Sequence, residues 1–154
     1  MSLVVYGAAL SPFVRKVRAC LLEKQLEYTS ELILPFKQPD WYYAISPLGR
    51  IPALRDGELN ICDSAVICAY LEDQYPDTPK LLAGTAAEVA RIRWLEKYAD
   101  YELAPLTTFT VFFNRTLAAS LGQACDEAAV QTALQKLVAH FDYLEQQLDG
   151  QEYF

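Results

Sequence analysis

Three short motifs in the first half of the chain carry the residue types that could do chemistry. They are Ser11-Pro12-Phe13, Ile51-Pro52 and Asp63-Ser64. In the first motif, serine is a preferred helix N-cap and proline fits the first helical position, so the motif predicts the start of a helix. The side chain of Ser11 and the backbone N–H groups behind it would face outward at the positive end of that helix. Such a position can hold and stabilise an anion.

The charge around this first motif is positive. Residues 1–22 contain no acidic side chain, and Arg15, Lys16 and Arg18 add positive charge. An ordinary capped helix explains Ser11 equally well, because serine caps are common. The motif by itself therefore leaves both an anion site and a simple cap open.

The other two motifs also allow a purely structural explanation. Pro52 stands at the start of a predicted strand directly after a turn, where proline cannot donate to a sheet ladder. Both a cis and a trans Ile51-Pro52 peptide bond fit this position. Asp63 and Ser64 are preferred N-cap residues, so they predict the start of another helix. Neither motif alone distinguishes a ligand site from local structure.

Hydrophobic patterning in the first half alternates between strands and helices. The predicted elements are a strand at 3–6, a helix at 12–24, a strand at 28–34, a short irregular or helical piece at 38–45, strands at 51–55 and 58–61, and a helix from 63 to about 75. The last two strands flank Asp56-Gly57, which is a strong hairpin signal. The order β-α-β-α-β-β-α predicts an α/β unit.

The second half is predicted to be entirely helical. Prolines and a glycine between residues 76 and 84 indicate a linker, so we expect one domain at 1–77 and another at 84–154. A long helical region covers 86 to about 120, and Pro105 should kink or break it. A second helix covers about 126–148 and carries an apolar stripe. The stripe consists of Val130, Leu134, Leu137, Phe141, Leu144 and Leu148.

Composition excludes several classes of function. The net charge of −7 argues against nucleic acid as a partner, which would require a basic face. No apolar run approaches the length of a membrane span, and the N-terminus has no signal-peptide layout. We therefore expect a cytoplasmic protein with no membrane partner.

The metal ligands and nucleophiles that the chain offers do not form a recognisable motif. The four cysteines show no metal-type spacing, and in a cytoplasmic protein we expect them to be reduced packing residues. His140 lies in a strongly helical segment with no catalytic motif around it, so we interpret it as structural or solvated. We therefore expect no metal.

Taken together, the three motifs at these spacings and the all-helical second half resemble the glutathione S-transferase superfamily. They are most similar to its serine-type soluble classes and their bacterial relatives, and the resemblance is strongest over residues 1–80. It implies a thioredoxin-like N-terminal domain with a mixed four-stranded sheet, which binds glutathione. It also implies an all-α domain that supplies most of the pocket for an electrophile.

The resemblance assigns roles to the residues of the three motifs. Ser11 would donate a hydrogen bond to the sulfur of glutathione, with Phe13 beside it in the site. Ile51 would pair its backbone with the cysteinyl part of the peptide, in a geometry shaped by Pro52. Two further residues, Asp63 and Ser64, would hold the γ-glutamyl end.

Three charged residues match the family less closely. Arg50 and Lys37 are candidates for the glycyl carboxylate. Asp100 lies where some relatives offer an acidic group from the second domain near the γ-glutamyl amine. All three assignments follow from the resemblance alone.

The resemblance implies a reaction in which glutathione is the co-substrate. A hydroxyl donor and a helix N-terminus both favour a thiolate over a thiol, so bound glutathione would attack a small hydrophobic electrophile. Glutathione-dependent isomerisation, dehalogenation or peroxidase activity would use the same thiolate. A non-catalytic binding or regulatory protein of the same fold is the alternative of a different class.

Two expectations concern the second half. The family is usually dimeric, and the long helices rich in aromatic residues fit either a homodimer contact or a core. The chain ends at Phe154, where relatives continue with further helices. The resemblance therefore implies a helical domain that is truncated relative to the family, with an apolar stripe that is partly uncovered.

Overall fold

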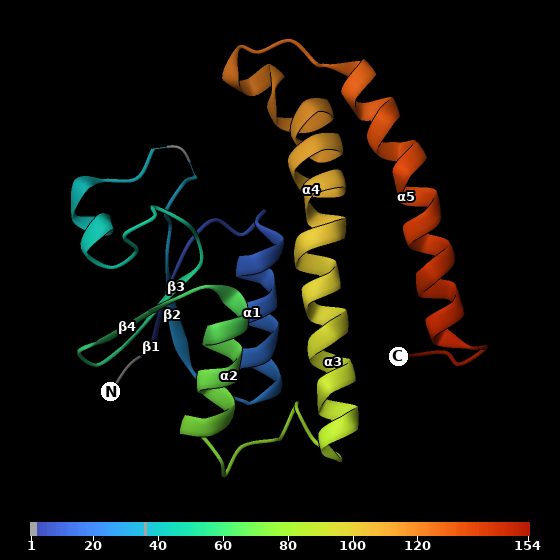
Figure 1. The fold of residues 1–154 in the computed structure, drawn as a ribbon. Helices are drawn as coiled ribbons and strands as arrows, with labels where there is room; N and C mark the ends of the chain where they lie inside the picture. The colour runs from blue at the N-terminus through green and yellow to red at the C-terminus, as the bar shows by residue number, and fades with distance from the viewer. Residues whose placement is uncertain (1–2, 36) are drawn as a thin grey trace. The chain divides into compact units, whose positions relative to one another are not determined.

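The computed structural model of this chain describes residues 3–35 and 37–154 (Figure 1). Contacts between residues divide it into two compact units, Met1–Thr85 and Ala86–Phe154. All four strands of the described residues belong to the first unit, and the second unit is helical.

The first unit has the predicted order of elements. It runs β1 (Leu3–Tyr6), α1 (Pro12–Glu23), β2 (Tyr28–Glu31), the 3-10 helix η1 (Asp40–Ala44), β3 (Ala53–Asp56), β4 (Leu59–Cys62) and α2 (Ser64–Gln74). Some strand bounds differ from those expected: β3 begins at Ala53 and not at Ile51, and β2 ends at Glu31 and not at Leu34. Its parallel partner β1 ends at Tyr6, and the N–H of Gly7 donates the last bond to the Glu31 carbonyl at 2.9 Å. The residues beyond Glu31 therefore have no neighbouring strand to pair with.

The predicted mixed four-stranded sheet is confirmed. Its strand order is β2-β1-β3-β4, with β1 parallel to β2 and the other two pairs antiparallel. In this register Tyr6 lies opposite Ala53, and Ala53 lies opposite Cys62. These three residues form one row across the sheet, and the chain leaves the sheet directly beyond that row.

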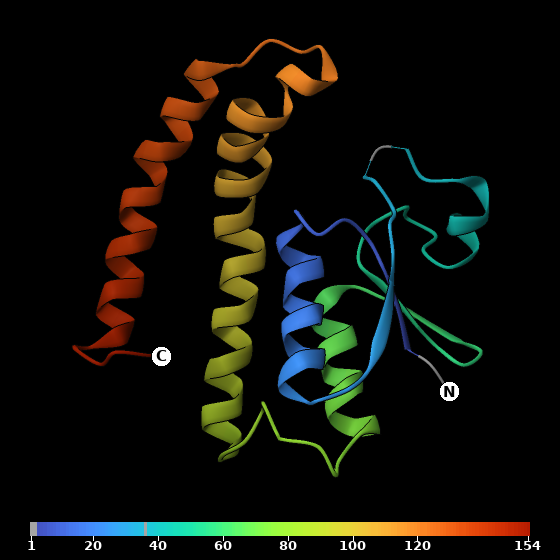
Figure 2. The ribbon, with the colours of Figure 1, turned by 180° about the vertical axis from the view of Figure 1, so that it is seen from behind.

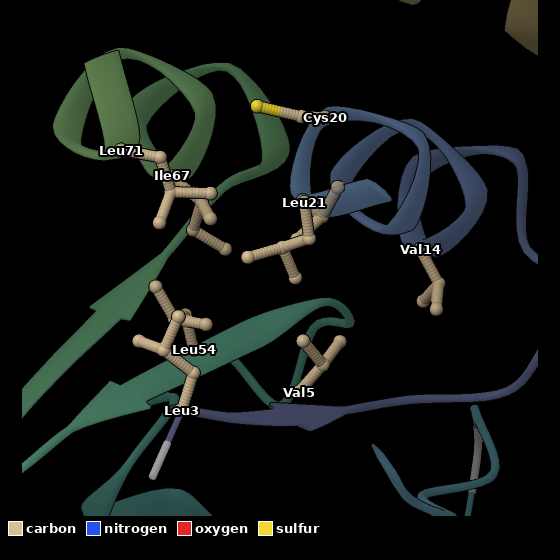
Figure 3. Close-up of a cluster of buried hydrophobic side chains, with 9 residues drawn as sticks. Leu3, Val5, Val14, Cys20, Leu21, Leu54, Ile67 and Leu71 are labelled. Atoms are coloured by element: carbon tan, nitrogen blue, oxygen red, sulfur yellow. The ribbon is translucent and has the colours of Figure 1, made fainter. Parts of the chain in front are cut away.

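Alternate residues of the sheet enter two hydrophobic clusters, one on each face. Leu3 and Val5 of β1 and Leu54 of β3 meet α1 and α2, which cover one face (Figures 1 and 3). In Figure 3 the side chains of Leu21, Ile67 and Leu71 point from the helices toward these strands. The next residues along the strands enter the second cluster. Its buried members are Val4, Tyr6, Ile33, Tyr42 and Ala53.

The second face of the sheet is covered by the segment that contains η1 (Figure 2). Tyr42 of η1 is fully buried there, and its ring lies 6.1 Å from that of Tyr6, between centroids. The segment before β3 is thereby packed against the strand that leads to Ser11.

A buried ion pair ties α1 to α2. Lys24 caps the end of α1 and is 1% exposed, and its Nζ lies 2.9 Å from Glu72 Oε1 of α2. Lys24 Nζ also donates to the carbonyl of Pro79, and Glu72 accepts from the N–H groups of Leu81 and Leu82. Burial acts to raise the pKa of Glu72, but these N–H groups and the ammonium outweigh it and lower the pKa below its usual range.

The second unit consists of two long helical stretches. The first runs through α3 (Ala86–Tyr98), η2 (Ala99–Leu103), α4 (Ala104–Leu106) and η3 (Thr107–Leu117), followed by η4 (Ala119–Leu121); the second is α5 (Glu127–Leu148). The chain does not break at Pro105. Instead η2 and η3 on either side of it form wide π-helical turns, in which the N–H of Ala118 donates to the carbonyl of Phe113. A wider turn accommodates the proline ring and its missing N–H.

The two stretches run antiparallel. Side chains of Arg91, Trp94 and Tyr98 bond to Gln147, Tyr143 and His140 respectively, so the partner numbers fall as the first numbers rise. Tyr98 Oη lies 2.6 Å from His140 Nδ1, which confirms the structural interpretation of this histidine. The predicted stripe on α5 is buried only in part. Val130 and Leu137 are buried, whereas Phe141 is 54% exposed.

None of the four cysteines, all of which lie in the described part of the chain, forms a disulfide. Cys20, Cys62 and Cys68 pack in or against the two clusters of the first unit, as expected for packing residues. The interpretation is wrong for Cys125, which is exposed and precedes α5. Asp126 follows it in the chain, and the Sγ of Cys125 lies 3.7 Å from Glu127 Oε2.

We expect Glu72→Gln to lower the free energy of unfolding by about 3 kcal/mol at neutral pH, because it leaves the buried ammonium of Lys24 uncompensated. Urea denaturation followed by circular dichroism measures the loss. Asp73→Asn is the matched control, since Asp73 is an exposed neighbour on the same helix, and it should cost less than about 0.5 kcal/mol.

The effect of Glu72→Gln should depend on pH. Because the pKa of Glu72 is lowered by folding, its carboxylate stabilises the fold above the unfolded pKa, and this stabilisation is lost as the pH falls through the folded value. The difference between the parent and Glu72→Gln should therefore shrink below pH about 4. A difference that is constant down to pH about 2 would contradict the ion pair as its cause.

Candidate functional site

The three sequence motifs lie at one end of the sheet, because the register of the strands brings them there. Gly7, Pro52 and Asp63 each stand one residue beyond the row formed by Tyr6, Ala53 and Cys62. The N-terminal ends of α1 and α2 lie at this same end of the sheet (Figure 2). We call the residues at this end of the sheet, from the three motifs and the loops that carry them, the sheet-end site.

Ser11 reaches the site through a tight turn after β1. Its N–H donates to the carbonyl of Ala8 at 3.0 Å, and it is the N-cap of α1, as predicted. Its hydroxyl oxygen accepts from the N–H of Val14 at 3.4 Å. Because the oxygen is the acceptor in this bond, the hydroxyl hydrogen can be donated to another group. Ser11 is half-buried, and no acidic side chain lies in the first turn of α1.

Gly7 allows the loop of Ser11 to approach the loop of Ile51. A Cβ atom on Gly7 would lie 2.5 Å from Val14 Cγ2 and 3.3 Å from Ile51 Cβ. Gly7 also has a φ of +151°, a conformation that side chains disfavour. The close contact of the first two motifs therefore requires glycine at this position.

The peptide bond between Ile51 and Pro52 is cis. Pro52 is buried, whereas Ile51 is half-buried and packs against both hydrophobic clusters. The residue before them, Arg50, is held through its backbone. Its carbonyl accepts from Tyr42 Oη at 2.8 Å and from Ser46 Oγ at 2.9 Å, and its N–H donates to Ser46 Oγ at 3.1 Å.

Asp63 is the N-cap of α2, as predicted. Its Oδ1 accepts from the N–H groups of Ala65 at 2.9 Å and Val66 at 3.2 Å. The residue has a positive φ of 75°, a conformation that aspartate tolerates better than most residues. Asp63 is exposed and Ser64 is buried, so the carboxylate lies at the surface of the site and the first turn of the helix lies beneath it.

The remaining predicted residues lie at different places. Phe13 is half-buried in the first turn of α1, close to Ser11 in the chain. The side chains of Lys37 and Arg50 are exposed in the segment before β3. Asp100 belongs to the second unit, within η2, and its part in the site stays a prediction.

Sequence reasoning missed three residues that shape the site, namely Gly7, Tyr42 and Ser46. In the sequence, Gly7 stands in a small-residue loop with Ala8 and Ala9, and Tyr42 stands between two other aromatic residues. Residues 46–49, Ser-Pro-Leu-Gly, are a turn signal. Nothing local, however, indicated that its serine would bond to the backbone of Arg50, since that bond depends on how the segment folds back.

The site offers donors and electropositive backbone, and no metal cluster. Among residues 3–35 and 37–154, no group of three or more His, Cys, Asp or Glu side chains could hold a metal ion. In the same residues, none of the helices combines the length and the apolar character needed to cross a bilayer. Two helix N-termini, a hydroxyl and a carboxylate around a cis-proline loop can bind an elongated polar molecule with anionic ends.

Comparison with known proteins identifies relatives of the whole chain. Residues 5–79 match the family model described as glutathione S-transferase, N-terminal domain. The chain is 31% identical to glutathione S-transferase F10 of Arabidopsis thaliana over 99% of this chain and 72% of that protein. It is 32% identical to glutathione S-transferase 3 of Zea mays over 98% of this chain and 69% of that protein.

Solved structures of glutathione S-transferases have the same fold as this chain. A glutathione S-transferase from Rhodospirillum rubrum superimposes with a TM-score of 0.86 at 30% identity, covering 96% of this chain and 67% of that one. The predicted fold class, a thioredoxin-like domain followed by a helical domain, is thereby confirmed.

We expect Gly7→Ala to lower the free energy of unfolding by about 2–3 kcal/mol, because the added methyl group meets the stiff, buried side chain of Val14. Thermal denaturation measures the loss. Gly122→Ala is the control, since Gly122 also has a positive φ of +72° but nothing lies within 4 Å of its Cβ position. It should cost only the backbone strain of about 1 kcal/mol, and equal losses for both variants would refute a close contact at Gly7.

Proposed function

The chain belongs to the glutathione S-transferase family, a family of enzymes, and we propose that it activates glutathione at the sheet-end site with Ser11. The observation that carries this proposal is the Ser11 hydroxyl, which accepts a hydrogen bond from the N–H of Val14 and keeps its hydrogen for the sulfur. The glutathione thiolate would then attack a small hydrophobic electrophile.

Two physical effects favour the thiolate at Ser11. A thiol in water ionises with a pKa near 8.5, so only a small fraction is thiolate at neutral pH. The Ser11 hydroxyl donates to the charged form, and the N-terminus of α1 adds positive potential that no acidic residue in its first turn offsets. A hydrogen bond and a helix end together can lower the thiol pKa by about one or two units.

The rest of glutathione would lie across the sheet-end site, next to the residues that follow the row of Tyr6, Ala53 and Cys62. The backbone of Ile51, in the geometry set by Pro52, would pair with the cysteinyl part like an added strand. The γ-glutamyl end would lie at α2, where the Asp63 carboxylate faces the amine. Ser64, through its hydroxyl and its N–H at the start of α2, would receive the carboxylate.

The charged residues around the site extend this assignment. We propose that the exposed side chains of Lys37 and Arg50 hold the glycyl carboxylate, and that Phe13 lines the site beside the sulfur. Asp100 of the second unit would face the γ-glutamyl amine. The positive charges of Lys37 and Arg50 would compensate the glycyl carboxylate on a chain whose net charge is −7.

The reaction needs no covalent enzyme intermediate. The thiol loses its proton to solvent, the sulfur forms a bond to the electrophilic carbon, and a leaving group such as a halide departs with its electron pair. Ser11 stabilises the negative charge on sulfur before the attack. The helical domain would supply most of the pocket for the electrophile.

Further parts of the proposal concern the whole protein. Residues 1–77 would form the glutathione-binding domain and residues 84–154 part of the helical domain. We propose a cytoplasmic homodimer, as the family resemblance implies. The chain spans 72% and 74% of the lengths of two related glutathione S-transferases.

We expect Ser11→Ala to raise the pKa of bound glutathione by at least one unit and to lower kcat/KM at neutral pH about 10- to 100-fold. Loss of the hydroxyl donor removes the hydrogen bond that favours the thiolate. Thiolate absorbance of the glutathione complex against pH, and conjugation of a chromogenic aryl halide, measure both effects.

The control for this variant is Ser30→Ala, an exposed serine on the edge strand β2, which should behave as the parent. If Ser11→Ala kept the parent's thiolate absorbance and rate, the assignment of Ser11 would be wrong. If the unaltered protein failed to bind immobilised glutathione, the glutathione site itself would be wrong.

We expect Asp63→Asn to raise the KM for glutathione about tenfold while the Tm changes by less than about 2 °C. Asparagine keeps an acceptor for the N–H groups of Ala65 and Val66 and tolerates the positive φ, so α2 stays capped. Only the charge that faces the γ-glutamyl amine is lost, an effect of about 1–2 kcal/mol. Steady-state kinetics with varied glutathione measures it, and an unchanged KM would remove Asp63 from the binding site.

A further inference from the structure

We propose that Tyr42 and Ser46 are positioning residues for glutathione, because their hydroxyl groups hold the backbone of Arg50 directly before Ile51. The inference rests on the proposed function, since it concerns the segment that would pair with the cysteinyl part of glutathione.

The two hydroxyl groups converge on one residue. Tyr42 Oη and Ser46 Oγ both donate to the carbonyl of Arg50, at 2.8 and 2.9 Å, so both lone pairs of that oxygen are engaged. Ser46 Oγ in turn accepts from the N–H of Arg50 at 3.1 Å. Both polar groups of the Arg50 backbone are thereby fixed by side chains that come from η1 and the turn after it.

Both side chains are buried, which makes their hydrogen bonds consequential. Tyr42 is fully buried and Ser46 is 1% exposed. Burial is the largest of the effects that raise the pKa of Tyr42 to about 12, so its hydroxyl is a neutral donor at neutral pH. Because Tyr42 and Ser46 are shielded from solvent, water competes little for their bonds to the Arg50 carbonyl.

Further bonds hold the same segment in place. The N–H of Gly49 donates to the carbonyl of Ser46 at 2.8 Å, and the side chain of Gln38 donates to the carbonyl of Gly49. The Tyr42 ring packs against Tyr6, which immediately precedes Gly7. Tyr42 therefore fixes the backbone next to Ile51 relative to β1, the strand that leads to Ser11.

A fixed backbone at Ile51 reduces the cost of binding an added strand, since less chain must be ordered when the ligand binds. Loosening it should weaken glutathione binding and leave the chemistry at the sulfur unchanged, because Ser11 lies on a different loop. The expected signature is a change in KM for glutathione without a change in kcat or in the thiol pKa.

The test compares Tyr42→Phe and Ser46→Ala with Tyr70→Phe. The control also removes one phenolic hydroxyl, which donates to Asp56 Oδ2 at 2.9 Å, at the opposite end of β3 from Pro52. We expect the KM for glutathione to rise about fivefold to twentyfold in each of the first two variants. In the same variants kcat at saturating glutathione should stay within about twofold, the pH-rate profile should be unchanged, and Tyr70→Phe should match the parent.

Three outcomes would overturn the inference. They are an unchanged KM in folded Tyr42→Phe and Ser46→Ala, an equal rise in Tyr70→Phe, or a shift of the thiol pKa of the size expected for Ser11→Ala. If one variant fails to fold by circular dichroism, the other supplies the same test. Absence of glutathione binding in the unaltered protein would instead overturn the proposed function.

Discussion

The antiparallel pairing of β3 with β1 on one side and β4 on the other is the constraint on which the site depends. It places Tyr6, Ala53 and Cys62 in one row, so that Gly7, Pro52 and Asp63 follow at the same end of the sheet. A shift of either register by one residue would turn every side chain of the strand to the other face and would separate the motifs. The alternating burial of β1, with Leu3 and Val5 in one cluster and Val4 and Tyr6 in the other, opposes such a shift.

Helix ends supply the electrostatics that the proposed chemistry needs. The chain as a whole is acidic, yet α1 and α2 have no acidic residue in their first turns and both begin at the site. A helix N-terminus acts over one turn, so a local positive end can coexist with a net charge of −7. Ser11 adds a hydroxyl donor to the positive potential at the start of α1. Asp63 adds a negative charge at the start of α2, which suits the ammonium group of a ligand.

The cores on the two faces of the sheet serve the site differently. The cluster beneath α1 and α2 holds the helices that present their N-termini, and the Lys24–Glu72 pair fixes their far ends to the following segment. The cluster on the other face holds η1, whose Tyr42 bonds to the backbone before Ile51. The three loops of the site are therefore each anchored by buried groups that lie outside them.

Much of this protein could be predicted from the sequence, because the relevant signals are local. The caps at Ser11 and Asp63, the hairpin at Asp56-Gly57 and the order of the elements depend on neighbouring residues, and the structure has them where they were expected. The end of β2 at Glu31, the wide helical turns around Pro105 and the role of Gly7 were not predictable in this way. Each depends on a partner distant in the chain or on how a whole helix adapts.

The sequence by itself determined which groups are available at the site: a capping serine, a proline after a turn, and an aspartate at a helix start. Tertiary structure alone decided that they share one end of one sheet, and that Tyr42 and Ser46 bond to the backbone of Arg50. The physical reason is that capping and turn preferences act within a few residues. Register, close approach at a glycine and buried hydrogen bonds are instead fixed by contacts that form only when the strands pair and the two faces of the sheet are covered.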